Sequence, residues 1–413
     1  MKPSIIFLSC FFLLVYVINP SFGQEVKFPW PEGKKMALSL SFDDARASNP
    51  THGIPLLNEV GIRATFFVIP QSVRNNLKGW QQAVESGHEM ANHSIIHPCS
   101  GNFVWSRNKA LENYTLDKMR EELLQANFEI ENLLGVTPTV YAYPCGQMYV
   151  GSGQHAQSLI PLISELFVAG RGWLAEAPVD PLYADMAQLT GIEMDNKTFE
   201  QIKAYIDQAS QSGQWLVLAG HETNDSGRQT TYLETLRQLA AYVNDPENGI
   251  WVAPIGEIAD YVQATRMAMA DTVNMPQLVR PTKDGKLHLT AENGRGVGPR
   301  IEYMPDWRAF GWFTGKDRVE WEVDAPQIGT YQAVMEWSVS DKESGKGFVF
   351  ESSKDSIRGQ VERSGSWETF KTLSIGKLML NGGYNKLVFR PEDDFGAEGA
   401  LLDLKQVTLI PVY

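Results

Sequence analysis

The sequence predicts an α/β barrel of the (β/α) kind in its first part and an all-β sandwich in its last part. Two observations predict this organisation. Between residues 24 and about 268, short apolar runs alternate with segments whose apolar residues recur every three or four positions, and strands that alternate with helices are typical of a parallel sheet. Beyond residue 286, short runs of alternating apolar and polar residues are separated by glycine-rich turns, which is typical of a β-sandwich.

The strands of the first domain are predicted from its apolar runs. They lie at residues 36–42, 64–69, 89–92, 139–143, 166–169, 215–220 and 250–253. About seven strand–helix units indicate a distorted barrel of TIM-like kind. The clearest helix spans residues 116–133, where apolar residues follow one face. Thr198 with Gln201, and Thr231 with Glu234, have the spacing of capping boxes that open two further helices.

The second domain is predicted at residues 286–413 as a jelly-roll-like sandwich, joined to the barrel domain (residues 24–268) by a linker at 269–285. Residues 319–323 and 331–337 alternate in the strand period. Their tryptophans, Trp321 and Trp337, are therefore expected in the core. Other aromatic residues flank a glycine in a predicted loop and are better candidates for ligand contact: Trp307, Phe310, Trp312 and Phe313.

The first 23 residues are predicted to be a signal peptide. Lys2 gives a positive start, residues 5–18 are apolar, and Ser21 and Gly23 are small residues before the cleavage point. The apolar run is too short for a comfortable membrane span, although a retained anchor and lipidation at Cys10 stay open as alternatives. We therefore expect a secreted or periplasmic protein without a stable membrane span after signal removal.

The net charge of the chain restricts the classes of binding partner. The formal net charge is −13 and Lys or Arg residues form no dense run, so we expect no nucleic-acid partner. Neutral or cationic glycans remain open as partners.

Polar residues that suit a metal ion follow two of the predicted strands. Asp43 and Asp44 end the first strand, and His93 and His97 follow the third. Barrel enzymes keep their active sites at this end of the strands. Histidines four residues apart on one face of a short helical turn can reach one metal ion, and Pro98 disfavours further helix. Two imidazoles and one carboxylate leave positions open for water and a substrate carbonyl; the set suits zinc best, and cobalt or nickel also fits.

Two further features follow predicted strands. Tyr143, Pro144, Cys145 and Gly146 come after the fourth strand, and their alternative interpretation is a plain turn. His221 ends the wholly apolar run 216–220. A histidine there is poorly explained by core packing, and its pKa near working pH suits a proton donor.

In this order and at this spacing, the four features resemble the polysaccharide deacetylase family (NodB-homology, carbohydrate esterase family 4-like). The segments at 41–44, 87–98, 141–146 and 218–222 resemble its motifs, and the resemblance covers roughly residues 34–265. It implies an acetylated glycan as substrate and a divalent metal ion. It also implies roles for five residues: Asp44, His93 and His97 as metal ligands, Asp43 as the base and His221 as the acid. The second domain more weakly resembles carbohydrate-binding-type β-sandwich modules, through residues 362–367 and 378–389.

One departure from the family concerns the base. Many members carry an arginine in the third motif that pairs with the base, and here that place is Ala142. Arg171 ends a predicted strand between two glycines, where close backbone approach is easy. We predict that Arg171 pairs with Asp43, against the alternative of a surface arginine in a glycine turn. Residues expected to line the sugar site are Tyr143, Pro144, Gly146, Arg171 and Trp173.

Cys99 and Cys145 both follow motifs expected to converge on the site. A disulfide between them and two free thiols both stay open. The expected reaction is hydrolysis of acetyl groups from N-acetylated sugars of a polysaccharide. The alternatives are an O-acetyl polysaccharide esterase, a non-sugar amide or ureide hydrolase, and a catalytically inactive glycan-binding protein. Asp43 and His221 argue against the last, since an inactive protein need not keep base and acid.

Overall fold

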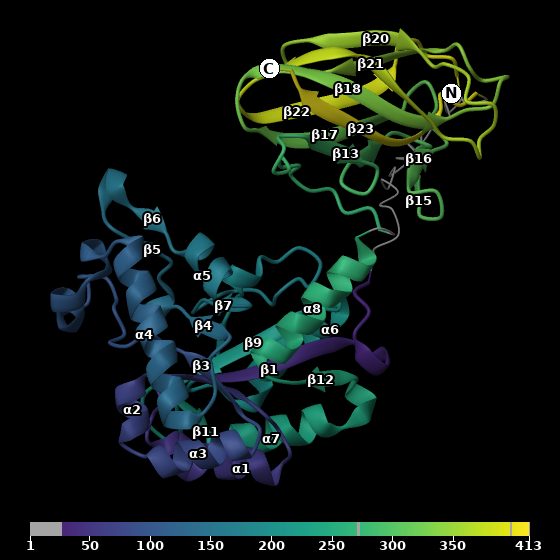
Figure 1. Ribbon diagram of the computed structural model, residues 1–413. Coiled ribbons are helices and arrows are strands. Elements are labelled where there is room, and N and C mark those ends of the chain that lie inside the picture. Colours follow the sequence, from purple (N-terminus) through teal and green to yellow (C-terminus); the bar gives the residue numbers. More distant parts are fainter. Residues whose placement is uncertain (1–26, 271–272, 397–398, 413) are drawn as a thin grey trace, which may run out of the picture.

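The structure is a computed structural model that describes residues 27–270, 273–396 and 399–412. It contains an α/β part followed by an all-β part (Figure 1). The predicted signal peptide, with the alternatives of an anchor or lipidation at Cys10, lies outside the described residues. Among the helices of the described ranges, none combines the length and apolar character that crossing a membrane requires.

Eight parallel strands form the sheet of the α/β part, in the order β7-β4-β3-β2-β1-β9-β8, with β12 paired to β1. Their bounds are β1 Met36–Asp43, β2 Thr65–Val68, β3 Glu89–Asn92, β4 Val140–Ala142, β7 Ala169–Arg171, β8 Ile192–Glu193, β9 Trp215–Gly220 and β12 Ile250–Val252. Leu189, just before β8, exchanges backbone hydrogen bonds with Gly170 and Gly172 at β7, 2.7 and 2.8 Å long. These bonds join the two ends of the sheet, so the fold is the distorted barrel that the sequence predicted.

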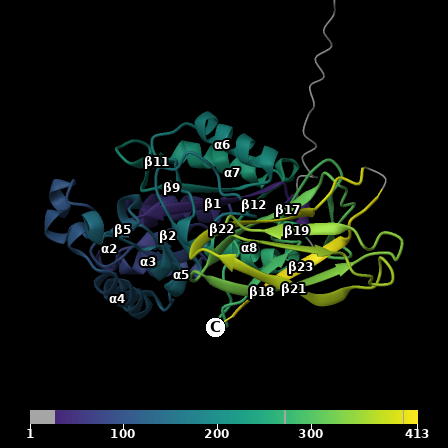
Figure 2. The ribbon, with the colours of Figure 1, turned by 90° about the horizontal axis from the view of Figure 1, so that it is seen from above.

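Helices surround this sheet, with α6 and α7 on one side of it and α3 and α4 on another (Figure 2). Their bounds are α1 Ile54–Glu59, α2 Pro70–Arg74, α3 Leu77–Glu85, α4 Leu116–Leu134, α5 Ile160–Leu166, α6 Phe199–Ser212, α7 Leu233–Asn244 and α8 Ile255–Met269. α4 follows the predicted helix closely: the Thr115 hydroxyl caps its start and Gly135, at φ 73°, ends it. Two short pairs, β5 Tyr149–Val150 with β6 Gln157–Ser158 and β10 Glu222–Asn224 with β11 Thr230–Tyr232, lie outside the barrel sheet.

Two local predictions for the barrel are wrong. The strand predicted at 166–169 is displaced, because α5 continues to Leu166 and β7 begins only at Ala169. The capping box predicted at Thr231 is absent from α7, whose N-cap is Tyr232 without a side-chain cap. The Thr231 hydroxyl bonds to a buried carboxylate instead, which outcompetes the local cap. The other predicted box, Thr198 with Gln201, is present at α6.

The all-β part consists of two antiparallel sheets, one in the order β15-β16-β23-β18-β21 with β13 on β23, the other in the order β14-β17-β22-β19-β20. The strands are β13 Leu287–Thr290, β14 Arg295–Val297, β15 Glu302–Met304, β16 Ala309–Gly311, β17 Arg318–Ala325, β18 Gly329–Ser338, β19 Gly347–Glu351, β20 Ser356–Gln360, β21 Lys371–Leu380, β22 Gly383–Pro391 and β23 Asp403–Pro411. Val279, within the predicted linker, is buried in the core of this part.

The aromatic residues of the sandwich divide between core and surface. Trp321 and Trp337 are buried, as their alternation predicted. Phe310 and Phe313 are also buried, so their prediction as contact residues is wrong: each packs into the same core. Trp307 and Trp312 remain exposed.

Candidate active site

The sheet register brings the predicted site residues to one edge of the barrel. Phe42 pairs with Gly220, so Asp43 and His221 follow neighbouring strands at the same level. Asp43 pairs with Phe67 on the other side of β1, and Asn92, which ends β3, is aligned with Val68. On the far side, Ala142 of β4 pairs with Arg171 of β7. Because all these strands are parallel, their carboxyl ends face one space.

Asp44, His93 and His97 converge at this edge. The Asp44 Oδ1 atom lies 3.4 Å from the Nε2 atom of each histidine, and the three candidate ligand atoms all lie within 4.8 Å of one another. Two ligands of a tetrahedral ion with bonds of about 2.1 Å are about 3.4 Å apart. The His93 Nδ1 atom lies 3.0 Å from the Ala142 carbonyl oxygen, which leaves Nε2 facing Asp44, as a metal-binding imidazole requires. These residues fit a divalent metal ion.

The loops that carry these ligands adopt backbone conformations that few side chains favour. Asp44 has φ 72°, and Ser94 and His97 have φ 63° and 53°. A left-handed conformation in residues other than glycine costs free energy and concentrates at functional sites. Residues 93–97 are therefore an irregular loop rather than the helical turn that their spacing predicted. The loop still brings both imidazoles together, with ring centroids 4.8 Å apart.

Charges around the ligands favour their metal-binding forms. Burial alone would raise the pKa of Asp44, but the hydrogen bond from His93 and the charges of His93, His97 and Arg46 lower it well below its usual range. Burial, reinforced by His93, lowers the pKa of His97 to about 4, so this imidazole is neutral near pH 7 and its nitrogen is free to bind a metal. Arg46, which no sequence motif indicated, contacts the second oxygen of Asp44 at 2.7 Å.

Asp43 is held by Arg171. The guanidinium Nη2 donates a hydrogen bond to Asp43 Oδ1, and both side chains are buried. Arg171 also lies over the Phe67 ring, 4.7 Å from its centroid. This is the pairing that the sequence predicted for Arg171, and the alternative of a surface arginine is excluded because the side chain is fully buried.

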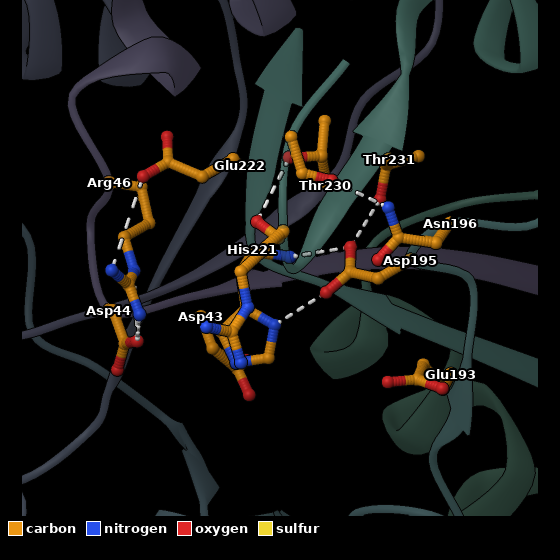
Figure 3. A network of polar contacts seen from close by, with 12 residues as sticks. Asp43, Asp44, Arg46, Glu193, Asp195, Asn196, His221, Glu222, Thr230 and Thr231 are labelled. Atoms are coloured by element: carbon orange, nitrogen blue, oxygen red, sulfur yellow. Dashed lines mark hydrogen bonds and ion pairs between the residues drawn. The ribbon is translucent and has the colours of Figure 1, made fainter.

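His221 is held by Asp195, a residue that the sequence did not indicate. The His221 Nδ1 atom lies 2.7 Å from Asp195 Oδ2, while Asp195 Oδ1 accepts hydrogen bonds from the His221 backbone N–H and from the Thr231 hydroxyl (Figure 3). Burial lowers the pKa of His221, but the hydrogen bond to Asp195 and the charge of Asp43 outweigh it, so the pKa is raised. A raised pKa keeps this imidazole protonated at higher pH.

The lack of a side chain at Gly220 allows Asp195 and Thr231 to come together. A Cβ atom on Gly220 would lie 2.3 Å from the Thr231 hydroxyl and 2.8 Å from Asp195 Oδ1. Any side chain there would therefore push these two groups apart. The sequence signal that could have identified Asp195 is weak, because the preceding strand, β8, has only two residues.

The residues predicted to line the sugar site take different positions. Tyr143 and Pro144 are buried, and the Tyr143 hydroxyl donates to the Ala187 carbonyl; burial argues against direct substrate contact by either. Gly146, at φ 67°, lies in close contact with Trp173. The Trp173 ring stands edge-on to His221 with centroids 4.9 Å apart, so Trp173 flanks the site.

Cys99 and Cys145 form a disulfide, with Cα atoms 6.0 Å apart. The sequence left this open. The bond joins the loop after His97 to the turn after β4. It also removes both thiols as candidate ligands, although they lie near His97.

Comparisons with known proteins find similarity over part of the chain. Residues 31–159 match the family model described as polysaccharide deacetylase. A gellan lyase from a Bacillus species is 24% identical over 260 residues, which are 57% of this chain and 10% of that protein. A peptidoglycan-N-acetylglucosamine deacetylase from Listeria monocytogenes is 28% identical over 126 residues, which are 30% of this chain and 25% of that protein. The chain thus matches only a minor part of the length of either relative.

Among solved structures, a family 4 acetyl xylan esterase from Clostridium thermocellum in complex with a cobalt ion is similar to part of this chain. The alignment has 19% identity and a TM-score of 0.37, and it covers 55% of this chain and 91% of that chain.

Proposed function

We propose that this chain, whose residues 31–159 match the polysaccharide deacetylase family model, is a metal-dependent hydrolase that removes acetyl groups from N-acetylated sugars of a polysaccharide. The observation that carries the proposal is the convergence of three ligand side chains with a paired carboxylate and a paired imidazole at one barrel edge. Hydrolysis of an amide needs an attacking water, a polarised carbonyl and a protonated leaving amine.

The metal ion would be held by Asp44, His93 and His97. When bound, it supplies Lewis acidity toward the attacking water and the acetyl carbonyl. Two imidazoles and one carboxylate suit zinc best, and cobalt or nickel also fits this donor set.

Asp43 would take the proton from the attacking water. Its carboxylate is buried beside the ligand residue Asp44 and is oriented by Arg171. A buried carboxylate paired with a permanent cation is fixed in direction, as a general base requires.

His221 would donate a proton to the departing amine. Asp195 orients the ring through Nδ1, which leaves Nε2 available to the substrate. The raised pKa of His221 keeps the acid form populated near neutral pH. Trp173 beside this ring would form one wall of the sugar site.

The Cys99–Cys145 disulfide supports action in an oxidising compartment, outside the cytoplasm, because disulfides persist there. The secreted or periplasmic location and the glycan-binding role of the sandwich stay predictions.

The test is release of acetate and of free amine by the full-length protein from a panel of N- and O-acetylated glycans, with and without a chelator. We expect equal amounts of acetate and amine from N-acetylated members, lost with chelator and restored by added Zn²⁺. Acetate without amine would indicate an O-acetyl esterase instead. The proposal would be contradicted if the protein, fully loaded with metal, released no acetate from any glycan of the panel.

A further inference from the structure

Arg46 contacts the ligand carboxylate of Asp44 through two of its nitrogen atoms. The Nη2 and Nε atoms of Arg46 lie 2.7 and 3.0 Å from Asp44 Oδ2. The other oxygen, Asp44 Oδ1, lies 3.4 Å from the Nε2 atoms of His93 and His97. The two oxygens of this carboxylate therefore have separate partners: Oδ1 faces the imidazoles and Oδ2 faces the guanidinium.

The backbone between the two residues is bent in a way that allows this contact. Asp44 and Ala45 are consecutive residues with φ 72° and 52°, and such left-handed conformations cost free energy in residues other than glycine. The bend brings the side chain of Arg46 back onto Asp44. The segment is also held after the bend, because the Arg46 carbonyl accepts a hydrogen bond of 3.1 Å from the backbone N–H of buried Asn49.

A second carboxylate lies on the other side of the guanidinium. Arg46 Nη1 is 4.0 Å from Glu222 Oε1, and Glu222 Oε2 accepts a hydrogen bond from the Ser48 hydroxyl. Figure 3 shows the Arg46 side chain between Asp44 and Glu222. The two carboxylates restrict the position of the guanidinium without burying it, since 37% of the Arg46 side chain is exposed.

We propose that Arg46 is a positioning residue for the metal ion, which holds Asp44 Oδ2 away from the ion and fixes Oδ1 toward it. A group that hydrogen-bonds to a ligand carboxylate orients it, and its loss typically costs about 10- to 100-fold in metal affinity or activity. The charge of Arg46 also repels a cation, but Glu222 offsets that charge and the solvent screens a partly exposed guanidinium. We therefore expect orientation to outweigh repulsion. The inference rests on the proposed function and deepens it by assigning a residue that orients a metal ligand.

The test is the zinc affinity of the full-length apoprotein, measured by competition with a chromophoric chelator, so that no substrate is needed. Arg46→Ala should raise the Kd for Zn²⁺ about 10- to 100-fold. The free energy of unfolding of the apoprotein should stay near that of wild type, since partly exposed ion pairs contribute little to stability. Arg46→Lys, which keeps the charge but not the fixed fork of donors, should recover part of the affinity. Arg74→Ala is the matched control, because it breaks a 2.6 Å ion pair with Glu129 whose arginine is 42% exposed, and it should bind zinc like wild type.

The visible absorption of bound Co²⁺ gives a second readout, because it changes with the number and geometry of the ligands. In Arg46→Ala, Asp44 Oδ2 is free to approach the ion, so the spectrum should differ from that of wild type. Arg74→Ala should leave the spectrum unchanged.

A wild-type or lower Kd for Zn²⁺ in Arg46→Ala would overturn the role of Arg46, as would an unchanged Co²⁺ spectrum or an equal change in Arg74→Ala. An affinity in Arg46→Lys as weak as in Arg46→Ala would also overturn it, because a second cationic donor should restore some orientation. A large loss of unfolding free energy in the Arg46→Ala apoprotein would show that Arg46 supports the fold rather than the ligand. In all these cases, zinc binding by wild type leaves the proposed function standing. Failure of wild type to bind zinc, or to release acetate from the glycan panel, is instead a failure of the proposed function.

Discussion

The metal-ligand side of the site and its proton-transfer side differ in what fixes their side chains. Asp44 and His97 sit on loops whose φ angles are 72° and 53°, held by local hydrogen bonds and a nearby disulfide. Asp43 instead ends β1 and His221 directly follows β9, and each is oriented by a buried charged partner. Backbone strain is a local property of a loop. A buried charge pair instead joins strands that are distant in sequence, and loss of one member leaves a buried unpaired charge that strongly destabilises the fold.

This difference predicts which changes affect function alone and which affect folding as well. Loss of a ligand should remove metal and leave the barrel folded. Loss of Arg171 should weaken the barrel itself.

The largest effect is expected from His93→Ala. Removing one of three ligands should abolish tight metal binding and lower acetate release by a factor on the order of 10⁴ or more, because the ion contributes several kcal/mol to the transition state. Elemental analysis of the purified variant checks this, with His155→Ala, an exposed histidine, as the control. A wild-type metal content in His93→Ala would remove this site from consideration.

The variant Asp43→Asn distinguishes the proton-transfer side of the site from its metal-ligand side. It should retain the metal and lose roughly 10²- to 10⁴-fold in rate, the usual contribution of a general base. Steady-state kinetics together with metal analysis provide the measurement. Near-full activity would mean that Asp43 is not the base, and loss of metal would mean that it belongs to the ligand side.

Arg171→Ala should affect both stability and activity. Asp43 would be left buried without its cation, which typically costs about 3–5 kcal/mol of the free energy of unfolding. Denaturant unfolding measures this. Arg120→Ala, which breaks an exposed pair with Glu165, should leave stability nearly unchanged, since surface pairs contribute little. Equal losses of unfolding free energy in the two variants would show that the buried pair contributes no more to stability than the exposed pair.

The smallest effect is expected from Asp195→Asn. The variant removes the carboxylate charge from the hydrogen bond to the imidazole; hydrogen bonds to charged groups contribute about 1.5–3 kcal/mol, so the rate should fall roughly 10- to 100-fold. Asp195 raises the pKa of His221, and the acid acts while protonated. Removing the charge lowers that pKa, so the basic limb of the pH–rate profile should move to lower pH. A limb that stays in place, or moves equally in the control Asp207→Asn, a half-exposed residue of α6, would exclude Asp195 as the partner of the acid.

Local sequence patterns determined much of the barrel. The apolar runs at 36–42 and 215–220 are long enough to mark strands, and both appear as β1 and β9. Since parallel strands end at one edge, the polar residues that follow them could be placed together. Arg171 could also be selected as the partner of Asp43, because Ala142 offers no cation and Arg171 ends a predicted strand between two glycines, but only its burial in the structure excludes a surface arginine.

Only the tertiary structure decided the rest, because the deciding interactions join residues far apart in sequence or run against local preference. Asp195 follows a strand of only two residues, and its partners His221 and Thr231 lie 26 and 36 positions away. Thr231 has the local pattern of a helix cap, yet a buried carboxylate binds its hydroxyl more strongly. His97 takes a left-handed backbone, which sequence spacing cannot indicate for a residue other than glycine, because only the surrounding contacts outweigh its strain.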